Sequence, residues 1–262
     1  MFLLLLLLSL LGTVLSAVSA ETCSEQPVKI EHHTVYSEPL NGDLTFDVYI
    51  PPCMDERISG GYPVVYLFHG QDMDLGIWED LNTASIMRET INSEELPLFL
   101  LVVPQEDHYL LSLSLSGFGD AVLDTLIPLI DDNFNTCTKR ECRAIGGLSR
   151  GALWAEKIAF ENPFLFGSVA LMSMPGTFID DQSIYYLAEN HKPDNLLRIR
   201  IDVGSEDNYR HEAIKAASQL NYIGYLYEYT MKPGDHDQAY WSSMLPELFV
   251  WFSEGWKDVI LP

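Results

Sequence analysis

The sequence has 262 residues, of which 47% are apolar, enough to fill the core of one ordinary globular domain. Its formal net charge at pH 7 is -23. Such an acidic chain argues against nucleic acid as a partner, because the phosphate backbone is bound by Lys and Arg side chains.

Residues 1–20 differ from the rest of the sequence because they contain no charged side chain. They form an apolar run that is short for a membrane span, which needs about 20 apolar residues, and that ends in the small residues Val18-Ser19-Ala20. This pattern predicts a secretory signal peptide over residues 1–20 and a single mature domain over residues 21–262. An uncleaved N-terminal anchor and a lipid on Cys23 are the alternatives. We expect a secreted or extracytoplasmic protein with no membrane span in the mature chain.

The sequence contains four cysteines: Cys23, Cys53, Cys137 and Cys142. An even number of cysteines in an exported chain favours disulfide bonds. Cys137 and Cys142 could close a small loop, and Cys23 and Cys53 would then tie the N-terminus to the end of an early strand. Four free thiols are the alternative. Zinc is not expected, because the chain has no Cys-x-x-Cys pair.

The predicted elements begin with a β-hairpin at Asn41-Gly42, after which apolar and polar residues alternate up to Ile50. Continuous apolar runs then predict buried strands at 64–68, 98–103, 144–145, 169–172, 197–203 and 225–231. Between and after them, apolar residues at helical spacing predict helices within 122–130, 154–160 and 248–252. Strands that alternate with helices predict an α/β fold, with a doubly wound, mostly parallel sheet and an antiparallel N-terminal hairpin.

A Gly-x-Ser-x-Gly sequence, residues 147–151, follows one of these strands and opens a helix that should end near Pro163. This strand–turn–helix context predicts a nucleophile elbow, in which a serine lies on a turn so tight that neighbours with a Cβ would clash. An ordinary glycine-rich turn is the alternative. We therefore predict Ser149 as the nucleophile of a serine hydrolase.

A serine nucleophile needs a base and an acid, which follow it in the order acid, then His, in this kind of fold. The strand at 197–203 leads into Gly204-Ser205-Glu206-Asp207. The position just past the strand end favours Asp207 as the acid, with Glu206 in reserve. Asp202 lies within the strand and is expected to face the core or a neighbouring side chain.

His236 lies in a loop after the last predicted strand and before a final helix that should start near Tyr240. This position predicts that His236 is the general base. A surface histidine, or a metal site shared with Asp235 and Asp237, are the alternatives. The other downstream histidines are His191 and His211.

The strand at 64–68 leads directly into His69-Gly70-Gln71, where hydrolases of this fold place an oxyanion-hole loop. The expected donors are the backbone N–H groups of Gln71 and Arg150. His69 is expected to order the loop rather than to act as base, and together with Trp78 it is a candidate for the substrate pocket. Segment 106–117 could cover the site. The other candidate pocket walls are Trp154, Trp241, Tyr185 and Tyr186.

The sequence resembles the esterase family of α/β-hydrolases that includes esterase D, feruloyl esterases, enterochelin esterases and the antigen 85 mycolyltransferases, and it is most similar to exported bacterial members. One departure is Ala152, where many members have a second glycine. The resemblance spans about residue 44 to the C-terminus and rests on residues 66–70 with Trp78, residues 126–131, residues 144–151, residues 204–207, residues 234–236, and Tyr240 with Trp241.

This resemblance implies hydrolysis of carboxylic esters through an acyl-enzyme, with no cofactor and no metal. It implies Ser149 as nucleophile, Asp207 as acid and His236 as base. The expected partner is a small-molecule or carbohydrate ester, and the sequence gives no signal for an oligomeric state. The alternative functions are an acyltransferase that uses the same acyl-enzyme, a non-catalytic carbohydrate- or surface-binding protein on a hydrolase scaffold, and a protease.

Overall fold

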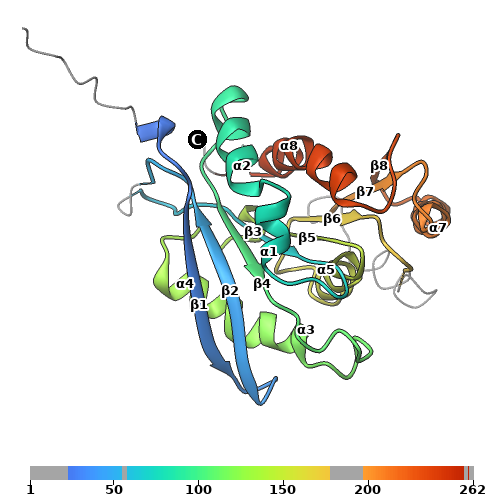
Figure 1. The fold of residues 1–262 in the computed structure, drawn as a ribbon, viewed down its shortest axis with the longest axis horizontal. Coiled ribbons are helices and arrows are strands. Elements are labelled where there is room, and N and C mark those ends of the chain that lie inside the picture. Colours follow the sequence, from blue (N-terminus) through green and yellow to red (C-terminus); the bar gives the residue numbers. More distant parts are fainter. Residues whose placement is uncertain (1–22, 55–57, 178–196, 257–258, 260–262) are drawn as a thin grey trace, which may run out of the picture.

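The computed structural model describes residues 23–54, 58–177, 197–256 and 259, so the predicted signal peptide lies outside the described residues. An eight-stranded sheet has the strand order β1-β2-β4-β3-β5-β6-β7-β8 (Figure 1). The strands are β1 (Lys29–Ser37), β2 (Gly42–Ile50), β3 (Val64–Phe68), β4 (Leu100–Pro104), β5 (Arg143–Leu148), β6 (Ser168–Met172), β7 (Arg198–Gly204) and β8 (Glu228–Lys232).

The sheet is mixed because of its N-terminal hairpin. β1 pairs antiparallel with β2, β2 pairs antiparallel with β4, and all the other neighbours are parallel. The hairpin turns at Asn41, whose φ of 47° is a left-handed conformation that Asn tolerates better than most residues. The mostly parallel sheet with an antiparallel hairpin is thereby confirmed.

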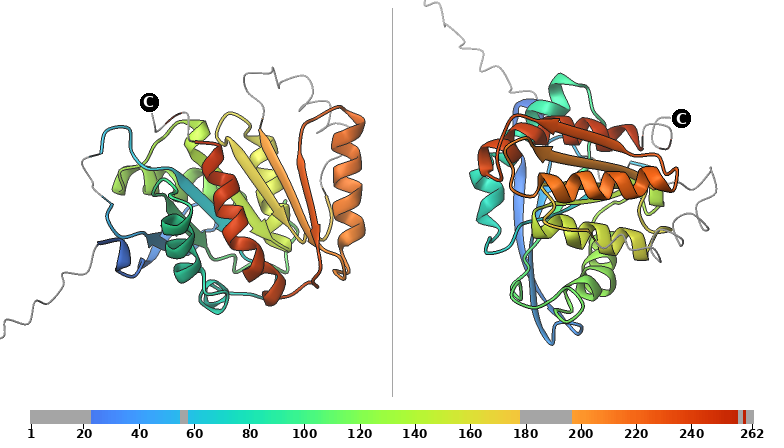
Figure 2. Two further views of the ribbon diagram at one scale, coloured as in Figure 1. Left: turned by 90° about the horizontal axis from the view of Figure 1, so that it is seen from above. Right: turned by 90° about the vertical axis from the view of Figure 1, so that its right-hand side faces the viewer.

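Helices cover both faces of this sheet. One face carries α3 (Phe118–Ala121), a π-helical turn (Val122–Leu126), α4 (Ile127–Asn133), α5 (Arg150–Glu161) and α7 (Arg210–Tyr222). The other carries α1 (Gly76–Asp80), α2 (Thr83–Ser93) and α8 (Gln238–Glu254), and Figure 2 shows α8 and α5 on opposite sides of the strands. Tyr66 and Phe68 pack on the α5 side, whereas Val65 and Leu67 pack on the α8 side. Both faces are therefore buried, as a central parallel strand requires.

The boundaries of β8 differ from the prediction. The apolar run suggested a strand from residue 225, but β8 begins at Glu228. Tyr225 is buried in the core and donates its hydroxyl hydrogen bond to the Leu197 carbonyl, 2.9 Å away. Tyr225 therefore packs in the core just before the strand and does not pair within it. The periodicity of apolar residues does not distinguish these two positions.

Two disulfide bonds join the cysteines in the predicted pairs. Cys23 and Cys53 are bonded, with 5.5 Å between their Cα atoms, and Cys137 is bonded to Cys142, with 5.8 Å between theirs. In this arrangement Cys23 has no free thiol for a lipid. Across the described ranges, no helix combines the length and the apolar character that a bilayer crossing requires.

Candidate active site

Ser149 lies between β5 and α5 on a strained turn, with φ 55° and ψ -123°. Two glycines permit this turn. A Cβ on Gly147 would lie 2.3 Å from the backbone of Gly151, and a Cβ on Gly151 would lie 2.2 Å from the Phe68 carbonyl oxygen. No side chain fits at either position, so the spacing Gly-x-Ser-x-Gly is a steric requirement of the elbow. The same close approach brings the start of α5 against the end of β3.

The structure brings the three predicted triad residues together from three loops. His236 Nε2 lies 2.9 Å from Ser149 Oγ, and His236 Nδ1 lies 3.0 Å from Asp207 Oδ2. The Asp207 carboxylate can only accept, so Nδ1 carries the hydrogen and Nε2 is left to accept from the serine hydroxyl. The Asp207 side chain has no exposed surface, whereas the His236 side chain is 21% exposed.

The His236 ring is also held by two aromatic side chains. The Tyr209 ring lies 5.0 Å from it and the Trp241 ring 5.1 Å, both edge to face. Tyr209 uses its backbone N–H to bind Asp207 Oδ1 at 2.7 Å, and Trp241 donates from Nε1 to Ser173 Oγ at 3.0 Å. The two aromatic rings therefore fix the orientation of the imidazole plane, in addition to the contacts at its two nitrogens.

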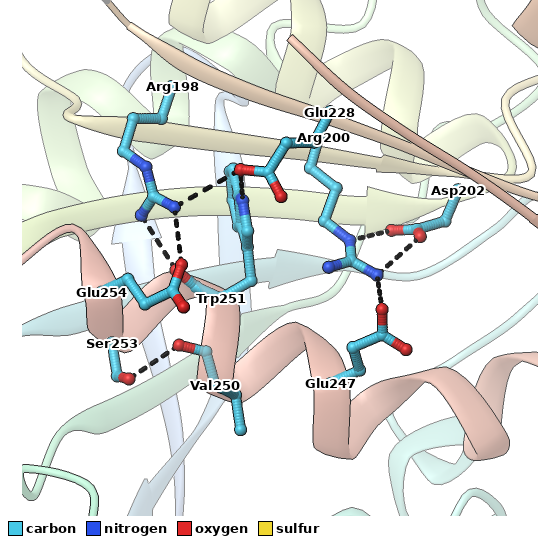
Figure 3. Close-up of polar contacts among 9 residues, drawn as sticks. All are labelled: Arg198, Arg200, Asp202, Glu228, Glu247, Val250, Trp251, Ser253 and Glu254. Atoms are coloured by element: carbon cyan, nitrogen blue, oxygen red, sulfur yellow. Dashed lines mark hydrogen bonds and ion pairs between the residues drawn. The ribbon is translucent and has the colours of Figure 1, made fainter.

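The other two carboxylates near the strand end have other partners. Glu206 Oε2 accepts from the Gly234 N–H and from the Ser205 hydroxyl, each at 2.7 Å, and the Gly234 bond in particular lowers the pKa of Glu206. Asp202 accepts two hydrogen bonds from Arg200, at 2.8 and 2.9 Å, within a polar cluster between β7 and α8 (Figure 3). Asp202 thus faces a neighbouring side chain, as the sequence suggested.

The aspartates that flank His236 accept hydrogen bonds from nearby backbone N–H groups. Asp235 accepts from the His236 N–H at 2.7 Å, and Asp237 caps α8 by accepting from the Tyr240 N–H at 2.9 Å. The residues that the structure describes contain no group of His, Cys, Asp and Glu side chains suited to hold a metal ion. Of the other downstream histidines, His211 is exposed on α7 and His191 lies outside the described residues.

The loop after β3 is ordered by His69, which is 2% exposed. Its Nε2 accepts from the Glu106 N–H at 2.9 Å, and its Nδ1–H donates to the Gly70 carbonyl at 2.8 Å. Burial lowers the pKa of His69, which favours this neutral form. His69 orders the loop through these two hydrogen bonds. Its side chain presents almost no surface to a substrate, so its place in the pocket wall stays a prediction.

Gln71 and Arg150, the two predicted oxyanion donors, lie in the segments that the elbow brings together. Gln71 is exposed in the loop after β3. Arg150 is the first residue of α5, where a backbone N–H has no intrahelical acceptor. A helix N-terminus also carries partial positive charge, which favours an anion.

The tryptophans expected to line the substrate pocket are buried where the structure describes them, so their place in a pocket stays a prediction. Trp78 lies on α1, has no exposed surface and belongs to the buried cluster on the α8 side of the sheet. Trp154 is 1% exposed and packs edge to face on Phe118. Trp241 supports the His236 ring, as described above. These side chains present almost no surface to a substrate, and sequence position alone does not reveal such burial. Tyr185 and Tyr186 lie outside the described residues.

Sequence reasoning missed two features of the site. Tyr209 follows Asp207 by two residues, and no local pattern distinguishes it from a surface tyrosine. Glu106 forms an ion pair with the Arg150 side chain. The sequence did contain a signal for Glu106, because this carboxylate lies just past the end of β4, where the sites of parallel sheets form.

Comparison with known proteins places this chain in a family. The family model "Esterase" (described as "Putative esterase") matches residues 37–252. An endo-1,4-beta-xylanase/feruloyl esterase of Xylanibacter ruminicola is 28% identical over 172 residues, which cover 60% of this chain and 24% of that protein. The chain thus spans about a quarter of the length of this relative.

Solved structures of esterases share the fold. A ferulic acid esterase superposes with a TM-score of 0.76 at 22% identity, covering 87% of this chain and 99% of that one. A ferulic acid esterase from Anaeromyces mucronatus, in complex with ferulic acid, gives a TM-score of 0.73 at 18% identity, covering 89% and 93% of the two chains. The predicted fold class is thereby confirmed, and the chain belongs to the esterase family of α/β-hydrolases.

Proposed function

We propose that this protein is a serine esterase that cleaves carboxylic esters through an acyl-enzyme on Ser149. The observation that carries the proposal is the chain of contacts from Ser149 Oγ to His236 Nε2, 2.9 Å, and from His236 Nδ1 to Asp207 Oδ2, 3.0 Å. A base within hydrogen-bond reach of a nucleophile, itself oriented by a buried acid, is the arrangement that activates a serine hydroxyl.

In the first half-reaction, Ser149 Oγ attacks the ester carbonyl carbon while His236 Nε2 takes its proton. Asp207 stabilises the imidazolium and keeps the ring in the productive tautomer. The carbonyl oxygen becomes an oxyanion that the backbone N–H groups of Gln71 and Arg150 bind. When the carbon–oxygen ester bond breaks, His236 delivers the proton to the departing alkoxide, and the alcohol leaves.

In the second half-reaction, water replaces the alcohol. His236 Nε2 takes a proton from the water as its oxygen attacks the acyl carbon of the Ser149 ester. The same oxyanion site stabilises the second tetrahedral intermediate. Its collapse breaks the bond to Ser149 Oγ, which regains its proton from His236, and the free acid leaves. No cofactor or metal enters this cycle.

For the substrate we propose an ester between an aromatic carboxylic acid of the ferulic type and a carbohydrate or other small alcohol. The names of the similar proteins support this class, because the relative is a xylanase/feruloyl esterase and one structural neighbour holds ferulic acid. The net charge of -23 is consistent with a neutral or cationic substrate rather than with a polyanion.

We further propose that the protein is exported, with residues 1–20 removed as a signal peptide. The apolar N-terminus and the two disulfide bonds support export, because disulfides persist in oxidising compartments. N-terminal sequencing of the protein recovered outside the cell tests this. A mature chain that starts at Glu21 is expected, and a retained Met1 would contradict it.

Hydrolysis of an ester panel tests the proposed activity. The panel contains p-nitrophenyl acetate, butyrate and octanoate together with methyl ferulate, and the matched control is Ser149→Ala. We expect turnover by the parent, highest relative to uncatalysed hydrolysis for the ferulate, and loss of at least about 10³-fold in the variant. A folded parent that hydrolyses no ester would contradict the proposal.

A further inference from the structure

A buried ion pair lies directly beside the nucleophile. Arg150 donates from Nε to Glu106 Oε2 at 2.8 Å and from Nη2 to Glu106 Oε1 at 2.6 Å. The side chains are 10% and 3% exposed. The two parallel hydrogen bonds fix the position and orientation of both groups, and burial shields them from water. Arg150 follows the nucleophile in sequence, so this contact reaches the first residue of α5.

The ion pair continues into the loop after β3. The Glu106 backbone N–H donates to His69 Nε2, and His69 Nδ1–H donates to the Gly70 carbonyl. A single chain of contacts therefore runs Arg150–Glu106–His69–Gly70. Its two ends adjoin the two backbone N–H groups that the proposed mechanism uses for the oxyanion, those of Arg150 and Gln71.

The same pair also holds the segment after β4. Arg150 Nη2 donates to the Leu111 carbonyl at 2.8 Å, and Gln105 Nε2 donates to the Met73 carbonyl at 3.3 Å. Residues 105–111 are thus bonded both to the start of α5 and to the loop after β3. They bridge the two sides of the oxyanion site.

Stability alone does not account for this pair. Transfer of two charges from water into a protein interior costs about as much as their attraction returns, and apolar side chains of similar size often stabilise a fold equally well. An unpaired Glu106 charge at this position would in addition oppose the negative charge that develops on the substrate oxygen. Arg150 both neutralises the charge of that carboxylate and fixes its orientation.

We propose that the Glu106 and Arg150 side chains are positioning residues, which set the spacing of the Gln71 and Arg150 N–H donors of the oxyanion hole. This inference rests on the proposed serine-hydrolase function. It predicts that loss of the pair lowers kcat with little change in KM, because the donors act on the transition state rather than on the bound ester.

The test compares the parent with Arg150→Met, Glu106→Gln and the double variant. The loss of one complete oxyanion donor costs about 10²- to 10³-fold, so for Arg150→Met we expect a fall in kcat of roughly 10- to 100-fold with KM within about threefold. The double variant should lose less than Arg150→Met, because it has no unpaired buried charge. Arg150→Lys keeps the charge but not the paired hydrogen bonds, and should restore only part of the loss.

The matched control is Arg143→Met. Arg143 forms a buried ion pair with Asp131 at 2.7 Å, with side-chain exposures of 4% and 20%, but it lies at the start of β5, the end of the strand remote from Ser149. This variant should lower the thermal midpoint and leave kcat per folded enzyme unchanged. Equal losses of kcat in Arg143→Met and Arg150→Met would overturn the inference, as would an Arg150→Met enzyme with kcat within twofold of the parent.

A second readout separates this inference from the ester-hydrolysis proposal. The rate at which a fluorophosphonate reagent modifies Ser149, followed by mass spectrometry, depends on the same oxyanion site without requiring ester turnover. If the parent is labelled but hydrolyses no ester, the ester proposal fails and the labelling rates of the variants decide the inference: slower labelling of Arg150→Met supports it, and an equal rate overturns it. A folded parent that is neither labelled nor active overturns both.

Discussion

Glu206 Oε2 accepts a hydrogen bond from the backbone N–H of Gly234 at 2.7 Å, and this contact ties the loop that carries Asp207 to the loop that carries His236. The loops also touch at Gly204, where a Cβ would lie 2.2 Å from the Gly234 carbonyl oxygen. The spacing between acid and base is therefore set by contacts outside the triad.

The Glu206 contact predicts a pH-dependent stability difference. The Gly234 and Ser205 hydrogen bonds lower the pKa of Glu206 below its value in an unfolded chain, about 4.3. Its contribution is therefore present above that value and is lost as the pH falls through the folded-state pKa. We expect Glu206→Gln to lower the thermal midpoint at pH 7, and the gap from the parent to narrow below about pH 4. The control is Glu94→Gln, which changes an exposed carboxylate. A difference in thermal midpoint between the parent and Glu206→Gln that widens on acidification would contradict this prediction.

Replacement of Trp78 tests its assignment to the core. Trp78 is fully buried in the core on the α8 side of the sheet, so we expect Trp78→Ala to lose about 3–5 kcal/mol of unfolding free energy. The relative rates across the acyl chains of the ester panel should stay the same. Denaturant unfolding and the panel together measure both effects. A near-normal stability combined with altered chain-length preference would instead place Trp78 against the substrate.

Tyr209 is expected to act through the orientation of His236. Its ring packs edge to face on the imidazole, and such pairs contribute about 0.5–1.5 kcal/mol. Tyr209→Ala should therefore lower kcat about 2- to 10-fold, whereas Tyr209→Phe keeps the ring and should match the parent. The backbone N–H bond to Asp207 remains in both variants. Equal losses in the two variants would point to the hydroxyl rather than the ring.

The two disulfides should differ in their effect on stability. Cys23 and Cys53 are separated by 30 residues in sequence, and Cys137 and Cys142 by 5. Because a cross-link that closes a longer loop restricts the unfolded chain more, removal of the first should cost about 3–4 kcal/mol and removal of the second about 2 kcal/mol. Denaturant unfolding of Cys23→Ser/Cys53→Ser and Cys137→Ser/Cys142→Ser measures this. The reverse order of losses would argue against the chain-entropy account.

Local steric requirements explain which parts of the site could be predicted from sequence. The elbow depends on Gly147 and Gly151, whose missing side chains are visible in the sequence itself. Asp207 and His236 could be placed because chain order and strand ends restrict where an acid and a base can lie. These predictions use local sequence patterns and the order of those patterns along the chain.

Tertiary contacts explain what could not be predicted. Glu106 and Arg150 are 44 positions apart, and only the folded sheet brings β4 and α5 close enough for them to pair. Trp78 likewise belongs to a buried cluster that includes residues of α8, more than 150 positions later in the chain. The start of β8 was misplaced for a related reason, because Tyr225 packs in the core and does not pair in the strand.

Identification of the acylated residue tests the central claim most directly. The protein is mixed with excess p-nitrophenyl acetate, quenched with acid within milliseconds to seconds, digested and mapped by mass spectrometry, with Ser149→Ala treated in parallel. The account predicts an acetyl group on Ser149 in the parent, and no adduct and no ester turnover in the variant. An adduct on another residue that keeps pace with turnover, or undiminished turnover by Ser149→Ala, would contradict it.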